Sequence, residues 1–352
     1  MIKVAILGYG TVGSGVVEVL TTNAGIIAKR AGQEVGVKYV LDLRDFPGDP
    51  IQSKVVHDFQ IILDDPEVDI VVETMGGTKP AYEFVKKALL AGKSVCTSNK
   101  ELVAAYGAEL VHLAKSKSVN FLFEASVGGG IPVIRPLNQS LTADKILKIN
   151  GILNGTTNYI LTKMAKEGSD FDVVLKEAQE LGYAEKDPTA DVEGYDACRK
   201  IAILTSLAYG KQVNYEEVYT EGITKITAED FKYAEKLEAA IKIFGSSRKE
   251  GGKLYAMVAP QMIRRDNPLF AVEGVFNAIC VTGNMLGDVM FYGKGAGKEA
   301  TASAVVSDVV DAVKHMNINV MTIWEDEKMI VEPMEEMENR FFVRIGKEEK
   351  EK

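Results

Sequence analysis

The chain has little cysteine, histidine and tryptophan: its 352 residues include three cysteines, three histidines and one tryptophan. Three cysteines cannot form a disulfide framework, so we expect a reducing compartment and a cytoplasmic protein. The histidines lie far apart in the sequence without the spacing of metal ligands. Zinc and disulfide scaffolds are therefore not expected.

Long apolar runs and excess positive charge are also missing. No apolar run approaches the length of about 18 residues that a membrane span needs, and the start MIKVAILGYG lacks a basic leader. The 41 basic and 50 acidic residues give a formal charge of −9, which argues against nucleic acid as the main partner. With 46% hydrophobic and 26% charged residues, the composition is that of a globular protein.

The first third of the chain alternates short apolar runs with helical patterns. Strands are predicted at 2–7, 35–41, 69–73, 94–97 and 119–124, and helices after residue 10 and at 81–91 and 100–117. This alternation is typical of an α/β fold with a doubly wound, Rossmann-type parallel sheet. We assign residues 1–133 to a dinucleotide-binding domain.

The pattern changes after the glycine-rich segment 128–132. Strands are predicted at 145–153, 254–261, 276–282 and 289–292, and helices at 157–166, 173–181 and 193–209. An antiparallel α+β second domain is expected over 134–297. We expect the helix at 298–316 to return to the first domain, and 317–352 to form a C-terminal extension.

The strongest single motif is G-x-G-x-x-G directly after the first strand. It comprises Gly8, Tyr9, Gly10, Thr11, Val12 and Gly13. Glycine at these positions permits a tight turn, a close approach of the pyrophosphate and close helix–strand packing. The motif predicts dinucleotide binding.

The choice between NADP and NAD stays open at the end of the second strand. Arg44 favours the 2′-phosphate of NADP, whereas Asp42 would accept hydrogen bonds from the ribose of NAD. The arginine inclines the prediction slightly toward NADP, or toward use of both cofactors.

Candidate catalytic side chains lie on one helix face. Asp196 and Lys200 are four residues apart, and Lys200 falls within the apolar stripe of the helix, so the pair is predicted to point inward. An inward pair indicates either a functional site or a buried structural ion pair. Upstream, Glu185 and Asp191 lie in a loop rich in carboxylates that suits a ligand ammonium or a capped connection equally well.

Two further segments carry polar groups. Ser98 and Lys100 follow a predicted parallel strand, and ligands of such sheets bind beyond the carboxyl ends of the strands. The segment from Glu124 to residue 132 joins a carboxylate to flexible backbone, which suits a hard cation. By its chemistry alone, this segment is more typical of a tight turn between domains.

Four segments resemble the homoserine dehydrogenase family. They are GGGIPVIRPL at 128–137, GILNGTTNYIL at 151–161, AQELGYAEKDPTADVEGYDACRK at 178–200 and FYGKGAGKEATAS at 291–303. The resemblance extends from residue 1 to about residue 345. It implies an NAD(P)-dependent oxidoreductase that interconverts L-homoserine and L-aspartate 4-semialdehyde, in the biosynthesis of threonine and methionine.

The resemblance also implies roles for individual residues. Lys200 handles the hydroxyl proton, Asp196 holds Lys200 and contacts substrate, and Lys100 lies where substrate meets cofactor. Glu185, with Asp191, binds the amino group of homoserine, and Gly182 and Gly297 line the cofactor site. A sodium ion is expected at Glu124 and the carbonyl groups of Val127, Gly129 and Ile131, and the family forms homodimers.

Two other functions remain as alternatives: a related reductase of a small amino-aldehyde or imine, and a non-catalytic NAD(P) sensor. Many relatives carry a C-terminal ACT domain that senses threonine. Residues 339–345 (NRFFVRI) suggest the first strand of such a domain, but too little chain follows to complete it, so feedback through an ACT domain is not expected.

Overall fold

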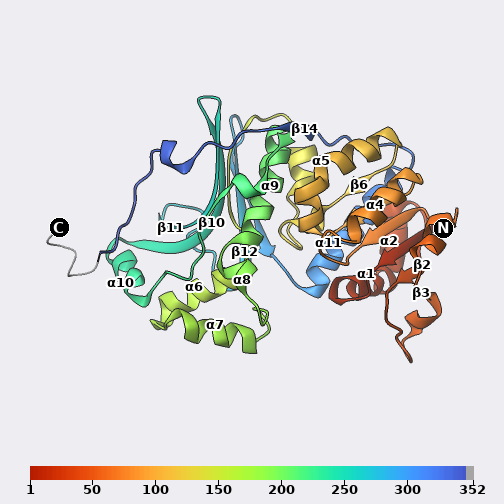
Figure 1. The fold of residues 1–352 in the computed structure, drawn as a ribbon, viewed down its shortest axis with the longest axis horizontal. Coiled ribbons are helices and arrows are strands. Elements are labelled where there is room, and N and C mark those ends of the chain that lie inside the picture. Colours follow the sequence, from red (N-terminus) through yellow and green to blue (C-terminus); the bar gives the residue numbers. More distant parts are fainter. Residues whose placement is uncertain (346–352) are drawn as a thin grey trace.

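The computed structural model describes residues 1–345 and contains two six-stranded sheets joined by helices (Figure 1). The first sheet has the order β3-β2-β1-β4-β5-β6 and is parallel throughout. Its strands are β1 (Ile2–Leu7), β2 (Val35–Leu41), β3 (Val55–Val56), β4 (Ile70–Glu73), β5 (Ser94–Thr97) and β6 (Phe121–Leu122). This order reverses between β1 and β4, as in Rossmann folds, and confirms the predicted fold class.

Helices cover both faces of this sheet. One face packs against α1 (Thr11–Thr22), α2 (Ala24–Ala31) and α11 (Lys298–Lys314); the other packs against α3 (Phe59–Asp64), α4 (Ala81–Leu90) and α5 (Lys100–Ser116). Figure 1 shows α11, in blue, beside the red α1, although nearly 300 residues separate them in the chain. The close approach needs glycine at position 15, because a Cβ there would lie only 3.0 Å from the Ala302 side chain.

The second sheet has the order β13-β12-β7-β10-β11-β9. Its strands are β7 (Ile146–Ile152), β9 (Tyr219–Thr220), β10 (Ala239–Glu250), β11 (Lys253–Arg264), β12 (Phe276–Gly283) and β13 (Gly287–Lys294). All neighbours are antiparallel except β9 and β11, which run parallel. The accompanying helices are α6 (Gly155–Glu167), α7 (Phe171–Glu180), α8 (Thr189–Val192), α9 (Tyr195–Tyr209) and α10 (Ala228–Lys236).

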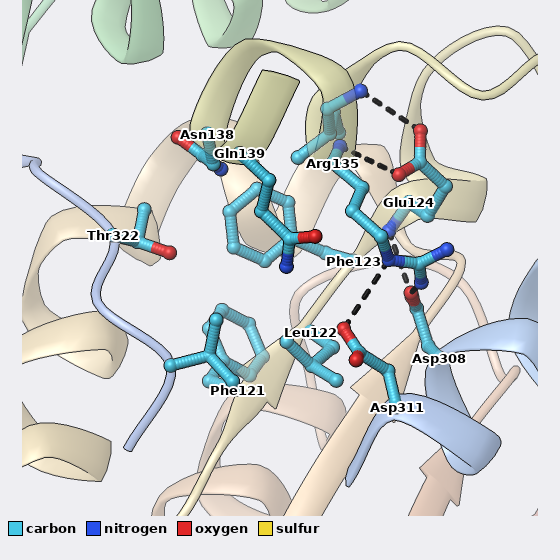
Figure 2. A pocket seen from close by; sticks show the side chains of 12 residues that line it. Phe121, Leu122, Phe123, Glu124, Arg135, Asn138, Gln139, Asp308, Asp311 and Thr322 are labelled. Atoms are coloured by element: carbon cyan, nitrogen blue, oxygen red, sulfur yellow. Dashed lines mark hydrogen bonds and ion pairs between the residues drawn. The ribbon is translucent and has the colours of Figure 1, made fainter. Parts of the chain in front are cut away.

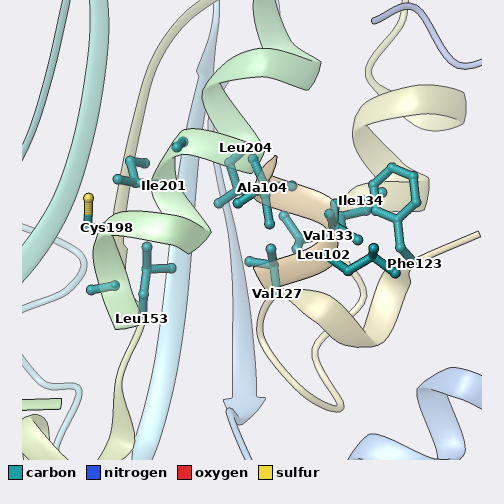
Figure 3. Close-up of a cluster of buried hydrophobic side chains, with 14 of the residues drawn as sticks. Leu102, Ala104, Phe123, Val127, Val133, Ile134, Leu153, Cys198, Ile201 and Leu204 are labelled. Atoms are coloured by element: carbon teal, nitrogen blue, oxygen red, sulfur yellow. The ribbon is translucent and has the colours of Figure 1, made fainter. Parts of the chain in front are cut away.

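Helices α5 and α9 join the two halves through one continuous hydrophobic core. Figure 3 shows side chains of both helices meeting there, with neighbours from the segment after β6. Labelled members include Leu102, Ala104, Ile201, Leu204, Val127 and Val133. Because α5 and α9 are packed together, residues at their ends are held in fixed positions relative to each other.

Several predicted boundaries were wrong. β6 ends at Leu122 instead of residue 124, because the chain turns into a short 3-10 helix at Glu124–Ser126. The helix predicted at 193–209 begins two residues later, at Tyr195, because Gly194 adopts a left-handed conformation with φ of +84° and separates α9 from the short α8. Residues 339–345, expected to begin a strand, form no strand; Arg344 instead donates to the Asp230 carboxylate on α10 at 2.6 Å.

Within residues 1–345, no single helix is long and apolar enough to cross a membrane. Helices α1 and α2 meet the length and hydropathy criteria only as a pair, and they are bent by 81° relative to each other.

Candidate active site

The turn between β1 and α1 leaves backbone amides accessible at the start of the helix. Gly8 has φ of +91°, and a Cβ on Gly13 would lie 1.9 Å from the carbonyl oxygen of Gly8. A Cβ on Gly10 would meet no atom within 4 Å, and no side chain caps α1. The turn of Gly8, Tyr9 and Gly10 and the first helical residues Thr11 and Val12 therefore form an anion-binding helix start.

Asp42 and Arg44 form one unit beside this turn. Both oxygens of the Asp42 carboxylate accept hydrogen bonds from the Arg44 guanidinium, each at 3.0 Å, and one also accepts from the backbone amide of Tyr9 at 2.8 Å. Arg44 holds the pKa of Asp42 well below its usual range, against the effect of burial. The two candidate residues for cofactor choice are thus paired with each other in this structure.

A carboxylate flanked by two lysines lies where α5 meets α9. The two oxygens of Asp196 pair with different ammonium groups: Oδ2 lies 2.6 Å from Nζ of Lys200, and Oδ1 lies 3.1 Å from Nζ of Lys100. Lys200 also donates to the carbonyl oxygen of Leu153 at 2.8 Å. The structure therefore joins Lys100 to the Asp196–Lys200 pair across nearly 100 residues of sequence.

In this cluster, burial and the neighbouring charges shift the pKa values in opposite directions. Burial alone would raise the pKa of Asp196, but Lys200 and Lys100 hold it well below its usual range. Burial would lower the pKa of Lys100, but Asp196 raises it overall. Asp196 is therefore a carboxylate at all but strongly acidic pH, and Lys100 is an ammonium at neutral pH.

Asn154 connects this cluster to Asp191, and sequence reasoning missed it. Its side-chain nitrogen donates to Asp191 at 2.7 Å and to Asp196 at 2.9 Å, while its oxygen caps α6 through the amide of Thr157. Burial, and then the charge of Asp196, raise the pKa of Asp191. The asparagine lies in the segment 151–161, so an N-cap pattern before the helix was the signal available.

The other predicted site residues lie outside this hydrogen-bonded cluster. Glu185 is exposed, and its carboxylate makes no hydrogen bond or ion pair with residues 1–345. Gly182 and Gly297 have positive φ, and a Cβ on either would meet no atom within 4 Å. Ser98 is half-buried at the carboxyl end of β5, where its amide faces the carbonyl oxygen of Glu73.

Glu124 shapes the backbone that follows it. Its two carboxylate oxygens accept from the amides of Val133, Ile134 and Arg135 at 2.6–2.8 Å. Figure 2 shows this arrangement beside a small cavity, with Arg135 reaching Asp308 and Asp311 on α11. Asp196, Lys100 and Lys200 do not line that cavity. Within residues 1–345, no three His, Cys, Asp or Glu side chains are grouped to hold a metal ion.

Family models match both halves of the chain. Residues 8–124 match the NAD binding domain of homoserine dehydrogenase, and residues 132–310 match the homoserine dehydrogenase model itself. The second match covers more than half of the chain.

Individual relatives agree with these models. Homoserine dehydrogenase of Bacillus subtilis is 44% identical over 326 residues, covering 91% of this chain and 74% of the relative. The crystal structure of a homoserine dehydrogenase from Thiobacillus denitrificans aligns with a TM-score of 0.87 at 42% identity, covering 93% and 79%. A hyperthermophilic archaeal homoserine dehydrogenase in complex with NADPH aligns with a TM-score of 0.74 at 31% identity, covering 88% and 97%.

Proposed function

Because this chain belongs to the homoserine dehydrogenase family, and is thus an NAD(P)-dependent oxidoreductase acting on homoserine, we propose how its own residues carry the reaction. The observation that carries the proposal is Asp196 between two lysines, at 2.6 Å from Lys200 and 3.1 Å from Lys100. The three groups lie beside the carboxyl ends of the parallel strands, where Rossmann sheets bind their ligands.

Lys200 transfers the proton of the substrate oxygen. Oxidation of the alcohol removes a hydride from carbon and a proton from oxygen, and the nicotinamide, when bound, takes the hydride. In oxidation, the amine of Lys200 accepts the proton; in reduction of the aldehyde, its ammonium returns one. The Asp196 carboxylate and the Leu153 carbonyl hold the Lys200 nitrogen in place at 2.6 and 2.8 Å.

The carboxylates of Glu185 and Asp191 recognise the substrate ammonium. Asp191 on α8 is half-buried and shares Asn154 with Asp196, so a cation placed beside it offsets the repulsion between the two carboxylates. Glu185 is exposed on the loop before α8 and is free to turn toward an amino group. Lys100 neutralises Asp196 from the cofactor side and contacts both substrate and cofactor.

The Gly8–Gly13 turn would hold the pyrophosphate of the cofactor, and Ser98, Gly182 and Gly297 would line the rest of its site. We expect NADP to be preferred, because the Asp42 carboxylate already accepts several hydrogen bonds and has little capacity left for a ribose hydroxyl. The exposed guanidinium of Arg44 retains donors for a 2′-phosphate. The initial rates with NADP and NAD measure this preference, and Arg44→Ala is expected to lower the rate with NADP more than the rate with NAD.

A sodium ion fits the loop 124–131 mainly through backbone oxygens. Residues Val127, Gly129 and Ile131 are buried, and their carbonyl oxygens accept no hydrogen bond from residues 1–345. The carboxylate of Glu124 is occupied by three amides, so its contribution is to bend the loop around the ion and to supply negative charge. Titration with sodium chloride, against choline chloride, is expected to raise the melting temperature; equal curves would contradict this site.

The second half of the chain supports a homodimer. The hairpin of β12 and β13 exposes Met285, Leu286, Met290 and Tyr292, an apolar set that a second copy would cover. We assign 134–297 to this substrate and dimerisation domain, and 1–133 with the helix at 298–316 to the cofactor domain. Light scattering coupled to size exclusion is expected to give twice the chain mass of 38.3 kDa.

The main test uses L-homoserine and NADP, with formation of NADPH followed by absorbance. Lys200→Ala is expected to lose turnover and to retain NADPH binding, measured by fluorescence. Full activity in this variant would remove Lys200 from the mechanism. Loss of both activity and NADPH binding would instead indicate a damaged fold.

A further inference from the structure

A carboxylate is buried without a cation at the centre of the first sheet. Glu73 is the last residue of β4, lies next to Leu7 of β1 and Thr97 of β5, and has no exposed surface. It therefore occupies the carboxyl end of the strand at which the strand order reverses. Within residues 1–345 it forms no ion pair, and burial raises its pKa while hydrogen bonds oppose the rise. A buried charge held only by hydrogen bonds is costly, so its partners are informative.

One oxygen of Glu73 holds the loop that follows β4. Its Oε1 accepts from the amide of Met75 at 2.7 Å. The next two residues, Gly76 and Gly77, have φ of +79° and +68°, and a Cβ on either would meet no atom within 4 Å. The hydroxyl of Thr74 donates to the carbonyl oxygen of Gly8 at 3.0 Å. The loop is thus tied to the dinucleotide-binding turn and presents two unshielded glycines.

The other oxygen of Glu73 leads to the start of α5. Its Oε2 accepts from the Thr97 hydroxyl at 2.6 Å, and the same hydroxyl oxygen accepts from the amide of Asn99 at 2.9 Å. Asn99 caps α5 by accepting from the amide of Leu102 at 3.0 Å, and it donates to the carbonyl oxygen of Gly77 at 2.6 Å. The next residue is Lys100.

We propose that Glu73 is a positioning residue that couples the loop 74–77 to the helix start that holds Lys100. The hydrogen bonds form a closed circuit: from Glu73 through the loop to Gly77, and from Glu73 through Thr97 and Asn99 back to Gly77. A single buried carboxylate thus sets both the wall beside the cofactor and the Lys100 nitrogen beside Asp196. This inference rests on the role proposed above for Lys100.

Two variants separate the two branches of the circuit. Glu73→Gln keeps the shape but has a single acceptor oxygen, so it cannot accept from both the Met75 amide and the Thr97 hydroxyl. It is expected to lower kcat at least about tenfold, since displacements near 1 Å are sufficient for larger losses, and to weaken NADPH binding about threefold or more. Thr97→Val breaks only the branch to α5. It is expected to lower kcat while the Kd for NADPH, measured by fluorescence, stays within about twofold.

The decisive measurement is a double-mutant cycle with Lys100→Ala. If Glu73 acts through Lys100, Glu73→Gln lowers kcat much less in the Lys100→Ala background than in the wild type. Independent multiplication of the two effects would overturn the inference and leave the role of Lys100 intact. Full activity of Lys100→Ala by itself would refute the proposed role of Lys100, and the coupling with it.

A matched control is Asp69→Asn at the opposite end of β4, where the carboxylate accepts from the amide of Lys3 at 2.8 Å. Its kcat and NADPH affinity are expected to match those of the wild type. Equal losses in Asp69→Asn and Glu73→Gln would attribute both to a weakened sheet and overturn the inference. If Glu73→Gln folds poorly, Thr97→Val, which removes no charge, tests the branch to α5.

Discussion

Two lysines are buried in the second half of the chain, one paired with a carboxylate and one not. Lys200 on α9 is 9% exposed and bonded to the Asp196 carboxylate at the junction of the two halves. Lys242 on β10 is 4% exposed, and its ammonium donates to the carbonyl oxygen of Val272. Within residues 1–345 no carboxylate lies within ion-pair distance of Lys242. Burial lowers the pKa of Lys242 to about 8, with Glu273 opposing and Lys166 assisting.

This difference separates Lys200, at a candidate catalytic site, from Lys242, whose burial has no catalytic role. A buried cation paired with a carboxylate, beside a second cation and a shared asparagine, is arranged for proton transfer. A buried cation with only a carbonyl partner lowers stability and has no group with which to exchange a proton. The depth of burial alone does not distinguish the two lysines; the charge of the partner does.

The largest expected effect comes from the same substitution at both positions. Lys200→Met is expected to lower kcat by about 10³-fold or more, because the general acid–base group is lost. Lys242→Met is expected to keep kcat within about twofold. Steady-state assays with homoserine and NADP measure both, and comparable losses in the two variants would end the distinction between these sites.

The next largest effect is expected from Asp196→Asn, which leaves Lys200, like Lys242, without a carboxylate partner. Asp196→Asn leaves a buried ammonium without its carboxylate and is expected to reduce the free energy of unfolding by about 3 kcal/mol at pH 7. The folded pKa of Asp196 is lowered, so its contribution is present above its unfolded pKa and is lost as the pH falls toward the folded value. The gap between variant and wild type in urea denaturation should therefore narrow in strong acid.

The exposed Glu180 on α7 supplies the control for that experiment. Glu180→Gln removes one negative charge from the same half of the chain and is expected to change stability by less than about 0.5 kcal/mol. An unchanged free energy of unfolding in Asp196→Asn would mean that the Asp196 carboxylate does not stabilise the buried Lys200 in the folded state.

A smaller effect on the free energy of unfolding, of opposite sign, is expected at Lys242. Lys242→Met is expected to raise the free energy of unfolding by about 1–3 kcal/mol at pH 7, because it removes a poorly compensated buried charge. The Val272 carbonyl keeps a second donor, the side chain of Asn158 at 3.4 Å. Urea denaturation at pH 7 measures the gain; a loss would show that the Lys242 hydrogen bond outweighs the burial of its charge.

The smallest effect is the part of the pH dependence of stability that Lys242 contributes, which is lost in Lys242→Met. Its folded pKa is about 8 and its ordinary pKa is 10.5, so between these values the unfolded chain binds more protons than the folded one. The stability contribution of the wild-type residue therefore rises with pH over this window, by up to about 1.4 kcal/mol per pH unit. The difference between wild type and Lys242→Met should shrink between pH 8 and 10.

Much of the first half could be predicted from local pattern. The strands at 2–7, 35–41 and 94–97 have the predicted ends, because glycines and polar turns bound short apolar runs. The inward direction of Asp196 and Lys200 also followed from helical spacing. Strand β10 was missed, because its second half, Gly245–Glu250, is polar and glycine- and serine-containing, and only its place between β7 and β11 makes it a strand.

The sequence by itself determined the dinucleotide-binding turn, the helix face of Asp196 and Lys200, and the family. The turn and the helix face depend on residues within one or two turns of each other, and the family on continuous segments such as 178–200. Only the tertiary structure decided that Lys100 shares Asp196, that Asn154 links Asp191 to it, and that Glu73 joins the loop 74–77 to α5. These contacts join segments from about 20 to nearly 100 residues apart, and no local periodicity records which side chains the packing of α5 on α9 brings within hydrogen-bonding distance.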